Sequence, residues 1–145
     1  VIGWFLANLP ILLALTLFFQ FLLRDLPPPS HPLTNELAGG AIGVATLVLF
    51  YFLAAIAAPF IEELTFRGLL FPALGRFMGV ASAAVLSGFL FAAIHPQGPV
   101  LWAGLAAIGV MASFLTYMTG SLVPAMVMHS VHNASVLTLA IVVLG

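Results

Sequence analysis

The sequence contains no cysteine and no lysine, and only 5% of its 145 residues are charged. The absence of cysteine excludes a disulfide framework and a zinc site made of four cysteines. There are three arginines and four acidic residues, and the net charge is −1. No basic surface is available to neutralise phosphates, so nucleic acid is excluded as a partner. Because a soluble domain carries roughly 25% charged residues, most of the outside of this chain must face lipid.

The sequence consists mainly of long apolar runs. Hydrophobic residues make up 63% of the chain, and the mean hydropathy is +1.27. A spanning helix needs about 20 apolar residues, and the first run, Val1–Leu23, meets that length. We predict that it spans the membrane, since it lacks the basic n-region of a signal peptide and is too long for an h-region. The chain starts with Val1 rather than Met, and we expect it to be a segment of a longer protein.

A proline-rich stretch separates this first run from the rest. Residues 24–36 hold four prolines, and we predict an aqueous loop there. Apolar character then continues over residues 37–75, too long for one perpendicular helix across a core of about 30 Å. The run predicts either a long tilted helix or one broken near Pro59. We divide the chain into an N-terminal transmembrane helix with its loop, residues 1–36, and a core, residues 37–145.

Turn-forming stretches divide the rest of the core into shorter helices. Turns at residues 77–79, 96–99 and 120–121 predict helices over residues 80–95, 100–119 and 121–144. The predicted fold class is all-α, a polytopic transmembrane bundle of about five spans with its active site inside. No strands are expected, because open sheet edges are not tolerated in lipid. The small residues Ala84, Gly88 and Ala92 form a seam that favours close helix packing.

Several polar residues interrupt the apolar helices. A charged residue at the centre of a bilayer costs about 2.5–3.5 kcal/mol, so such residues indicate function by default. The candidates are Glu62, Glu63, Arg67, His95, His129 and Asn133, with His132 as a further one.

The spacing of the first three candidates predicts an ion pair. Glu63 and Arg67 lie four residues apart with the acid first, the better orientation for pairing on a helix. Glu62 points about 100° away from Glu63, since a helix has 3.6 residues per turn. We therefore interpret the Glu63–Arg67 pair as structural and Glu62 as available for chemistry.

The other candidates share the same four-residue spacing. His129 and Asn133 project from one face of the last helix and offer two hydrogen-bond donors for a developing oxyanion. Phe91 and His95 place an aromatic wall beside an imidazole.

The depths of these side chains follow from counting residues from the turns. Glu62 and His95 each lie about 16 residues, or roughly 24 Å, from the turn near residue 78. Counted from Gly120, Asn133 lies at roughly 20 Å and His129 at roughly 14 Å. We expect Glu62, His95 and Asn133 at similar depth, with His129 one to two turns away.

The motifs in which these residues stand resemble those of the CPBP family, also called ABI or CAAX-protease and bacteriocin-processing proteins. Its motif EExxxR is similar to Glu62–Arg67, FxxxH to Phe91–His95, and HxxxN to His129–Asn133. The three occur in the family's order. The resemblance covers about residues 40–143.

The resemblance implies a glutamate-dependent intramembrane endopeptidase without a cofactor. It implies that Glu62 and His95 activate a water, and that His129 and Asn133 stabilise the oxyanion. Glu63 and Arg67 would support them. No Ser, Cys or Thr stands in the cluster as a nucleophile, which favours direct attack by water.

The resemblance also implies a partner and a location. The substrate would be a membrane-associated protein or peptide, CAAX-prenylated or of signal or bacteriocin type. The short loops indicate a prokaryotic plasma membrane. The sequence specifies no oligomeric state.

Three alternatives stay open. A zinc-dependent membrane metalloprotease would use Glu62, His95 and His129 as ligands, although HExxH is missing and an amide stands where a third strong ligand is expected. A non-catalytic bacteriocin self-immunity protein would use the same fold with its site idle. A proton-coupled transporter would use the buried acids and imidazoles as a relay, but no inverted repeat is evident.

Overall fold

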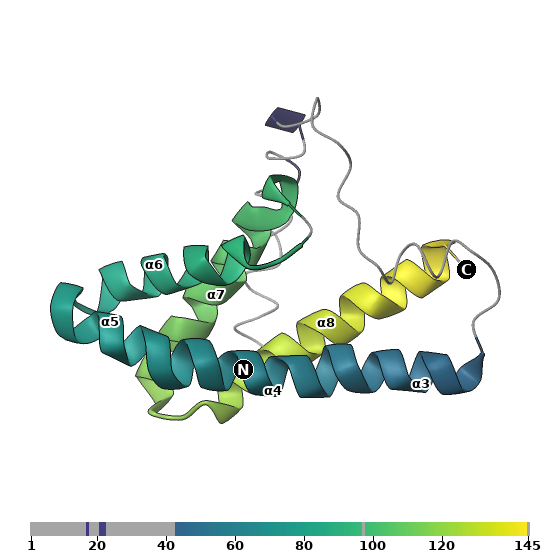
Figure 1. Ribbon diagram of the computed structural model, residues 1–145, viewed down its shortest axis with the longest axis horizontal. Coiled ribbons are helices and arrows are strands. Elements are labelled where there is room, and N and C mark those ends of the chain that lie inside the picture. The colour runs from purple at the N-terminus through teal and green to yellow at the C-terminus, as the bar shows by residue number, and fades with distance from the viewer. Residues whose placement is uncertain (1–16, 18–20, 23–42, 97, 145) are drawn as a thin grey trace.

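The structure is a computed structural model that describes residues 17, 21–22, 43–96 and 98–144 (Figure 1). Residues 17, 21 and 22 are helical. The rest of the predicted first span, its proline-rich loop and the first residues of the predicted core lie outside the described residues.

The described core is entirely helical, apart from turns. Three of its helices are long and apolar enough to cross a membrane: Val44–Met78, Leu101–Thr119 and Val123–Val142. A shorter apolar helix, Val80–Ala93, lies between the first two. No strand occurs in the part of the chain that the structure describes. The predicted all-α membrane bundle is confirmed, and its elements in order are α3 (Val44–Phe52), η1 (Leu53–Ala57), α4 (Ala58–Glu63), η2 (Leu64–Leu70), α5 (Phe71–Met78), α6 (Val80–Ala93), α7 (Pro99–Thr119) and α8 (Val123–Leu144).

The elements α3 to α5 join into one helical run of 35 residues that passes two prolines without a break. Proline has no N–H, and its ring clashes with the carbonyl four residues earlier in an α-helix. Here the backbone widens to π-helical turns, η1 and η2, just before Pro59 and Pro72. In each turn an N–H reaches back five residues, from Ala58 to Leu53 and from Phe71 to Phe66. The π-turns therefore accommodate both prolines, and the helix stays continuous.

Two turns reverse the chain after this run. Gly79, between α5 and α6, has a φ of +79°, a conformation open to glycine. Helix α6 ends at Ala93, two residues before the predicted end at His95, and the His95 N–H bonds to the Ala92 carbonyl. The cause is Pro96, since a residue before proline is disfavoured in the α region. His95 therefore lies in the turn that follows the helix.

Helices α6 and α7 cross at two glycines. A Cβ on Gly88 would lie 2.7 Å from the Ala106 carbonyl oxygen, and one on Gly109 would lie 2.7 Å from the Gly88 Cα. The backbones touch because neither residue has a side chain. The predicted seam of Ala84, Gly88 and Ala92 is buried along its whole length.

Helix α8 runs back along the first half of the 35-residue run at an angle, as Figure 1 shows. The Thr138 Oγ1 donates its only proton to the Ala134 carbonyl at 2.7 Å. In the 2.7 Å contact between Thr138 and the Tyr51 hydroxyl across the interface, Tyr51 is therefore the donor. This hydrogen bond joins α8 to the long helix.

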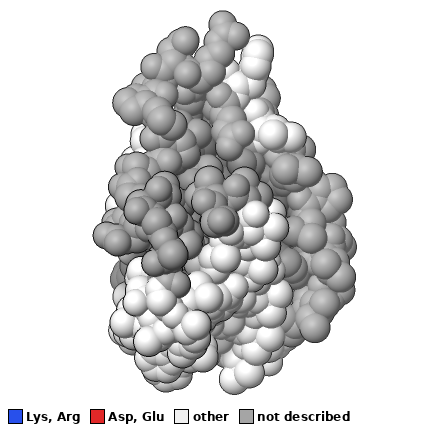
Figure 2. Space-filling view, turned by 90° about the vertical axis from the view of Figure 1, so that its right-hand side faces the viewer, with Lys and Arg blue, Asp and Glu red and all other residues white. Residues whose placement is uncertain are grey.

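The outside of the bundle is apolar. Large side chains such as Phe52, Phe60 and Leu139 expose more than half of their surface. The face in Figure 2 shows no acidic or basic side chain among the residues that are described there. An exposed apolar surface of this extent fits lipid as the solvent.

Candidate active site

The centre of the site is the carboxylate of Glu63, whose side chain is fully buried. Its Oε1 accepts a hydrogen bond from the Arg67 Nη1 at 3.0 Å and lies 2.9 Å from the His129 Nδ1. An ionised carboxylate only accepts hydrogen bonds, so the His129 Nδ1 carries a proton and donates. The predicted Glu63–Arg67 ion pair is present, and His129 joins it from α8.

Arg67 is anchored on three sides. Besides the bond to Glu63, its Nη2 donates to the Gly109 carbonyl at 2.9 Å. Its guanidinium carbon lies 4.7 Å from the centroid of the Phe91 ring and 5.7 Å from that of Phe66. Cation–π contacts of this kind strengthen when they are desolvated, and Arg67 is only 2% exposed. The cation is therefore fixed in one position, and it holds Glu63 in place.

Sequence reasoning missed Gly109 and Phe66 in this site. Gly109 matters through its missing side chain, because a Cβ there would lie 3.0 Å from the Arg67 Nη2. Its signal in the sequence was an isolated glycine in an apolar helix, which indicates close approach. Nothing in that pattern says that an arginine 42 residues away uses the space.

We expect Gly109→Ala to destabilise the protein by about 1–3 kcal/mol, because the added methyl overlaps backbone and the Arg67 guanidinium. The matched control is Gly75→Ala, whose Cβ would meet nothing within 4 Å. That change should stabilise a helix by about 0.5–1 kcal/mol. Both are measured as free energies of unfolding in detergent micelles. Similar values for the two variants would contradict the proposed role of the helix crossing.

Glu62 differs from Glu63 in its access to the surroundings. Its side chain is 25% exposed, and its Oε2 lies 3.6 Å from the His129 Nε2. His129 therefore stands between two carboxylates, bonded to Glu63 through one ring nitrogen and facing Glu62 with the other. The Oε2 atoms of Glu62 and Glu63 are both buried, and neither has a hydrogen-bond partner among the described residues. The two acids therefore differ in the exposure of their side chains, and the role of Glu62 as the available acid stays a prediction.

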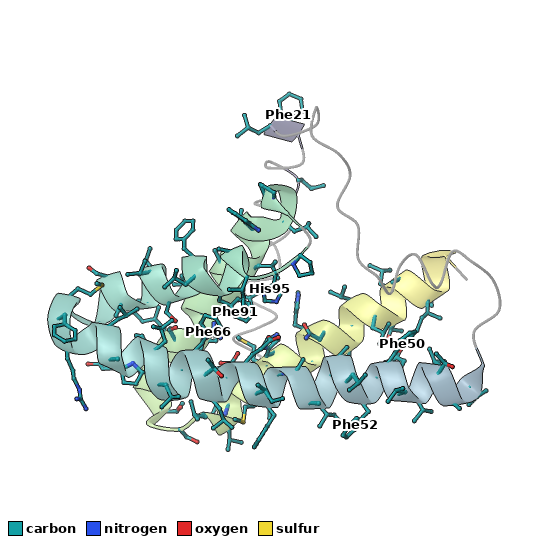
Figure 3. All side chains as sticks on the ribbon, viewed as in Figure 1. Phe21, Phe50, Phe52, Phe66, Phe91 and His95 are labelled. Atoms are coloured by element: carbon teal, nitrogen blue, oxygen red, sulfur yellow. The ribbon has the colours of Figure 1, made fainter. Side chains whose placement is uncertain are left out.

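His95 packs against the aromatic ring of Phe91 (Figure 3). Its ring centroid is 4.5 Å from that of Phe91, which lies 5.5 Å from the His129 ring. The His95 Nδ1 is 2.7 Å from the Phe91 carbonyl oxygen. A carbonyl only accepts, so Nδ1 carries the proton and Nε2 is the basic nitrogen of the neutral ring. Within the described part of the chain, His95 forms no ion pair with a carboxylate, so the structure does not bring it into contact with Glu62.

Asn133 lies farther from the glutamates than predicted. Its Nδ2 donates to the Ala54 carbonyl at 2.9 Å. Ala54 lies about two helical turns before Glu62 in the long helix. The expected order of depths is wrong, since His129 and not Asn133 lies level with the glutamates. The predicted depths hold only if the turns at Gly120 and Gly79 lie at the same depth. Instead, Leu122 lies against Gly68, well short of that end of the long helix.

The donor set does not fit the zinc alternative. Zinc takes three or four close ligands. Glu62 and His129 approach each other, whereas the described contacts of His95 are with Phe91 and not with a carboxylate. In the described residues no group of three or more His, Asp or Glu side chains is placed to hold a metal ion.

The fold and the site together define a helical integral membrane protein with an ionisable cluster among its spanning helices. The sequence profile of the family described as type II CAAX prenyl endopeptidase Rce1-like matches residues 44–135, which include every residue of the site. The chain belongs to this family, and it is a membrane peptidase that acts on a protein or peptide substrate. No curated protein and no solved structure matches the chain. The predicted resemblance to CAAX proteases is confirmed.

Proposed function

We propose that the chain hydrolyses a peptide bond by direct attack of a water that Glu62 activates. The observation that carries this proposal is the contrast between the two adjacent acids. Glu63 is buried and bonded to Arg67 and His129, whereas Glu62 is partly open and 3.6 Å from the His129 Nε2. Each acid has a carboxylate oxygen without a hydrogen-bond partner in the described part of the chain. Of the two side chains, however, only that of Glu62 is partly exposed, so Glu62 is the acid that water can reach.

In the proposed reaction, Glu62 takes one proton from water as the oxygen attacks the peptide carbonyl. His95 assists through its basic Nε2, with the water between the two residues. The C–N bond then breaks, and the proton on Glu62 passes to the leaving amine. The roles given to Glu62 and His95 follow the family resemblance. The bond from the His95 Nδ1 to the Phe91 carbonyl supports the role of His95, because it leaves Nε2 as the basic nitrogen.

We assign the oxyanion to His129 and Asn133. The His129 Nδ1 donates to Glu63, so a protonated ring has its Nε2–H left for the oxyanion. The Asn133 amide uses one N–H on the Ala54 carbonyl and keeps a second. Glu63 and Arg67 fix the position of His129, and no step uses a metal.

For the substrate we propose a membrane-anchored peptide whose apolar or prenylated end lies in the bilayer. The family description supports a prenylated CAAX terminus, and signal or bacteriocin-type peptides are the other candidates. The short connections between the described helices support a prokaryotic plasma membrane as the location.

The test uses purified protein in liposomes with a farnesylated CAAX peptide, the same peptide without its lipid, and mass spectrometry of the products. We expect one internal cleavage of the lipidated peptide, none with Glu62→Gln, and full activity after treatment with a zinc chelator. Activity that is lost on chelation and restored by zinc would contradict the mechanism. If no membrane peptide differs between wild-type and Glu62→Gln membranes, the proposed proteolysis is wrong.

A further inference from the structure

The carbonyl of Ala54 is left without a backbone donor by the local sequence. In the π-turn η1, the N–H of Ala58 bonds to the Leu53 carbonyl, so it is not available to Ala54. In the same register the donor for Ala54 would be residue 59. That residue is Pro59, which has no N–H. An unpaired carbonyl among spanning helices costs several kcal/mol, so another donor is needed.

The side chain of Asn133 supplies that donor. Its Nδ2 lies 2.9 Å from the Ala54 oxygen, across the interface between α8 and the long helix. This bond fixes the amide plane, because one N–H is held by an acceptor that belongs to rigid backbone. The second N–H and the amide oxygen then have set directions.

We propose that Pro59 is a positioning residue, which acts through the free carbonyl of Ala54 to orient the amide of Asn133. The catalytic consequence rests on the proposed function, in which the second N–H of Asn133 stabilises the oxyanion. With an N–H at position 59, the Ala54 carbonyl gains its own backbone donor, and Asn133 has to compete for it. Pro59, which lies in α4 three residues before Glu62, thus affects the active site as well as the geometry of the helix.

The experiment compares Pro59→Ala with Pro124→Ala in the full chain. Pro124 is the matched control because it lies in the first turn of α8, where a missing N–H leaves no helical carbonyl unpaired. We expect Pro59→Ala to lower kcat about tenfold with KM unchanged, since misorientation of a catalytic group affects the chemical step. Pro124→Ala should match the wild type. In an Asn133→Ala background, Pro59→Ala should have no further effect on kcat.

A spectroscopic measurement tests the inference independently of activity. The chain has three asparagines, so protein labelled with 15N-asparagine gives few side-chain amide signals. The signal of Asn133 is identified by its loss in Asn133→Ala. We expect its hydrogen-bonded proton to shift in Pro59→Ala and to stay in place in Pro124→Ala.

The two proposals fail in different ways. An Asn133 signal that is the same in Pro59→Ala and wild type overturns the positioning role, even if Glu62→Gln is inactive. Additive losses of kcat in the double variant overturn it as well. If Glu62→Gln remains active, the proposed mechanism is wrong, whatever the signal of Asn133 shows.

Discussion

Glu62→Gln should reduce the rate of peptide cleavage by about 10³-fold, the scale expected when a general base is removed. Glutamine has nearly the same shape as glutamate but cannot take a proton from water. The Glu62 side chain is partly exposed, and its Oε2 lies 3.6 Å from the His129 Nε2. The free energy of unfolding should therefore change by less than about 1 kcal/mol, as for other weak ion pairs. Single-turnover cleavage in liposomes measures the effect.

The matched control for this variant is Glu36→Gln, which removes an acid outside the family match at residues 44–135. It should cleave at the wild-type rate. A Glu62→Gln protein that turns over within about threefold of wild type would rule out Glu62 as the base. A loss of activity that accompanies unfolding would show that the side chain has a structural role instead.

Arg67→Met should destabilise the protein by about 3–5 kcal/mol, the cost of leaving one buried charge without its partner. Glu63 is fully buried, so without Arg67 its only remaining hydrogen-bond partner among the described side chains is His129. Methionine fills most of the space between Phe66 and Phe91 but carries no charge. Activity should be lost with stability, because Glu63 positions His129. Denaturation in detergent micelles measures the effect.

A double-mutant cycle identifies the cause of that loss. Glu63→Gln with Arg67→Met removes both charges, so the double variant should lose less stability than the sum of the single changes. Arg76→Met is the control, since Arg76 is exposed near the end of α5 and should contribute less than about 0.5 kcal/mol. Additive single effects would show that the two side chains act separately.

The sequence predicted local relations well because they follow from helix geometry. The Glu63–Arg67 pair and the contact between Phe91 and His95 both rest on a spacing of four residues, and both are present. The spanning helices were predictable because lipid requires long apolar segments.

Relations between helices could not be predicted, because they depend on tilt and on where each turn lies. The bond from His129 to Glu63 joins residues 66 positions apart. Predicting this bond would require knowing the depth of the turn before α8. That turn packs near Gly68 and not at the end of the long helix. The π-turns were also missed, since Pro59 alone is compatible with a break, a kink or a change of register.

Arg67 and His129 both contact the Oε1 of Glu63, so two basic side chains lie beside the two adjacent glutamates. In the proposed mechanism both glutamates are ionised and the His129 ring is protonated, so Arg67 and His129 offset the two negative charges. The resting cluster is then electrically neutral, which a low-dielectric surrounding favours. In the same proposal, Glu62 takes the proton of water as the substrate gains an oxyanion, so the cluster would gain one positive charge at that moment. The protein therefore supplies the counter-charge from its own side chains, and no ion has to enter the bilayer from the solvent.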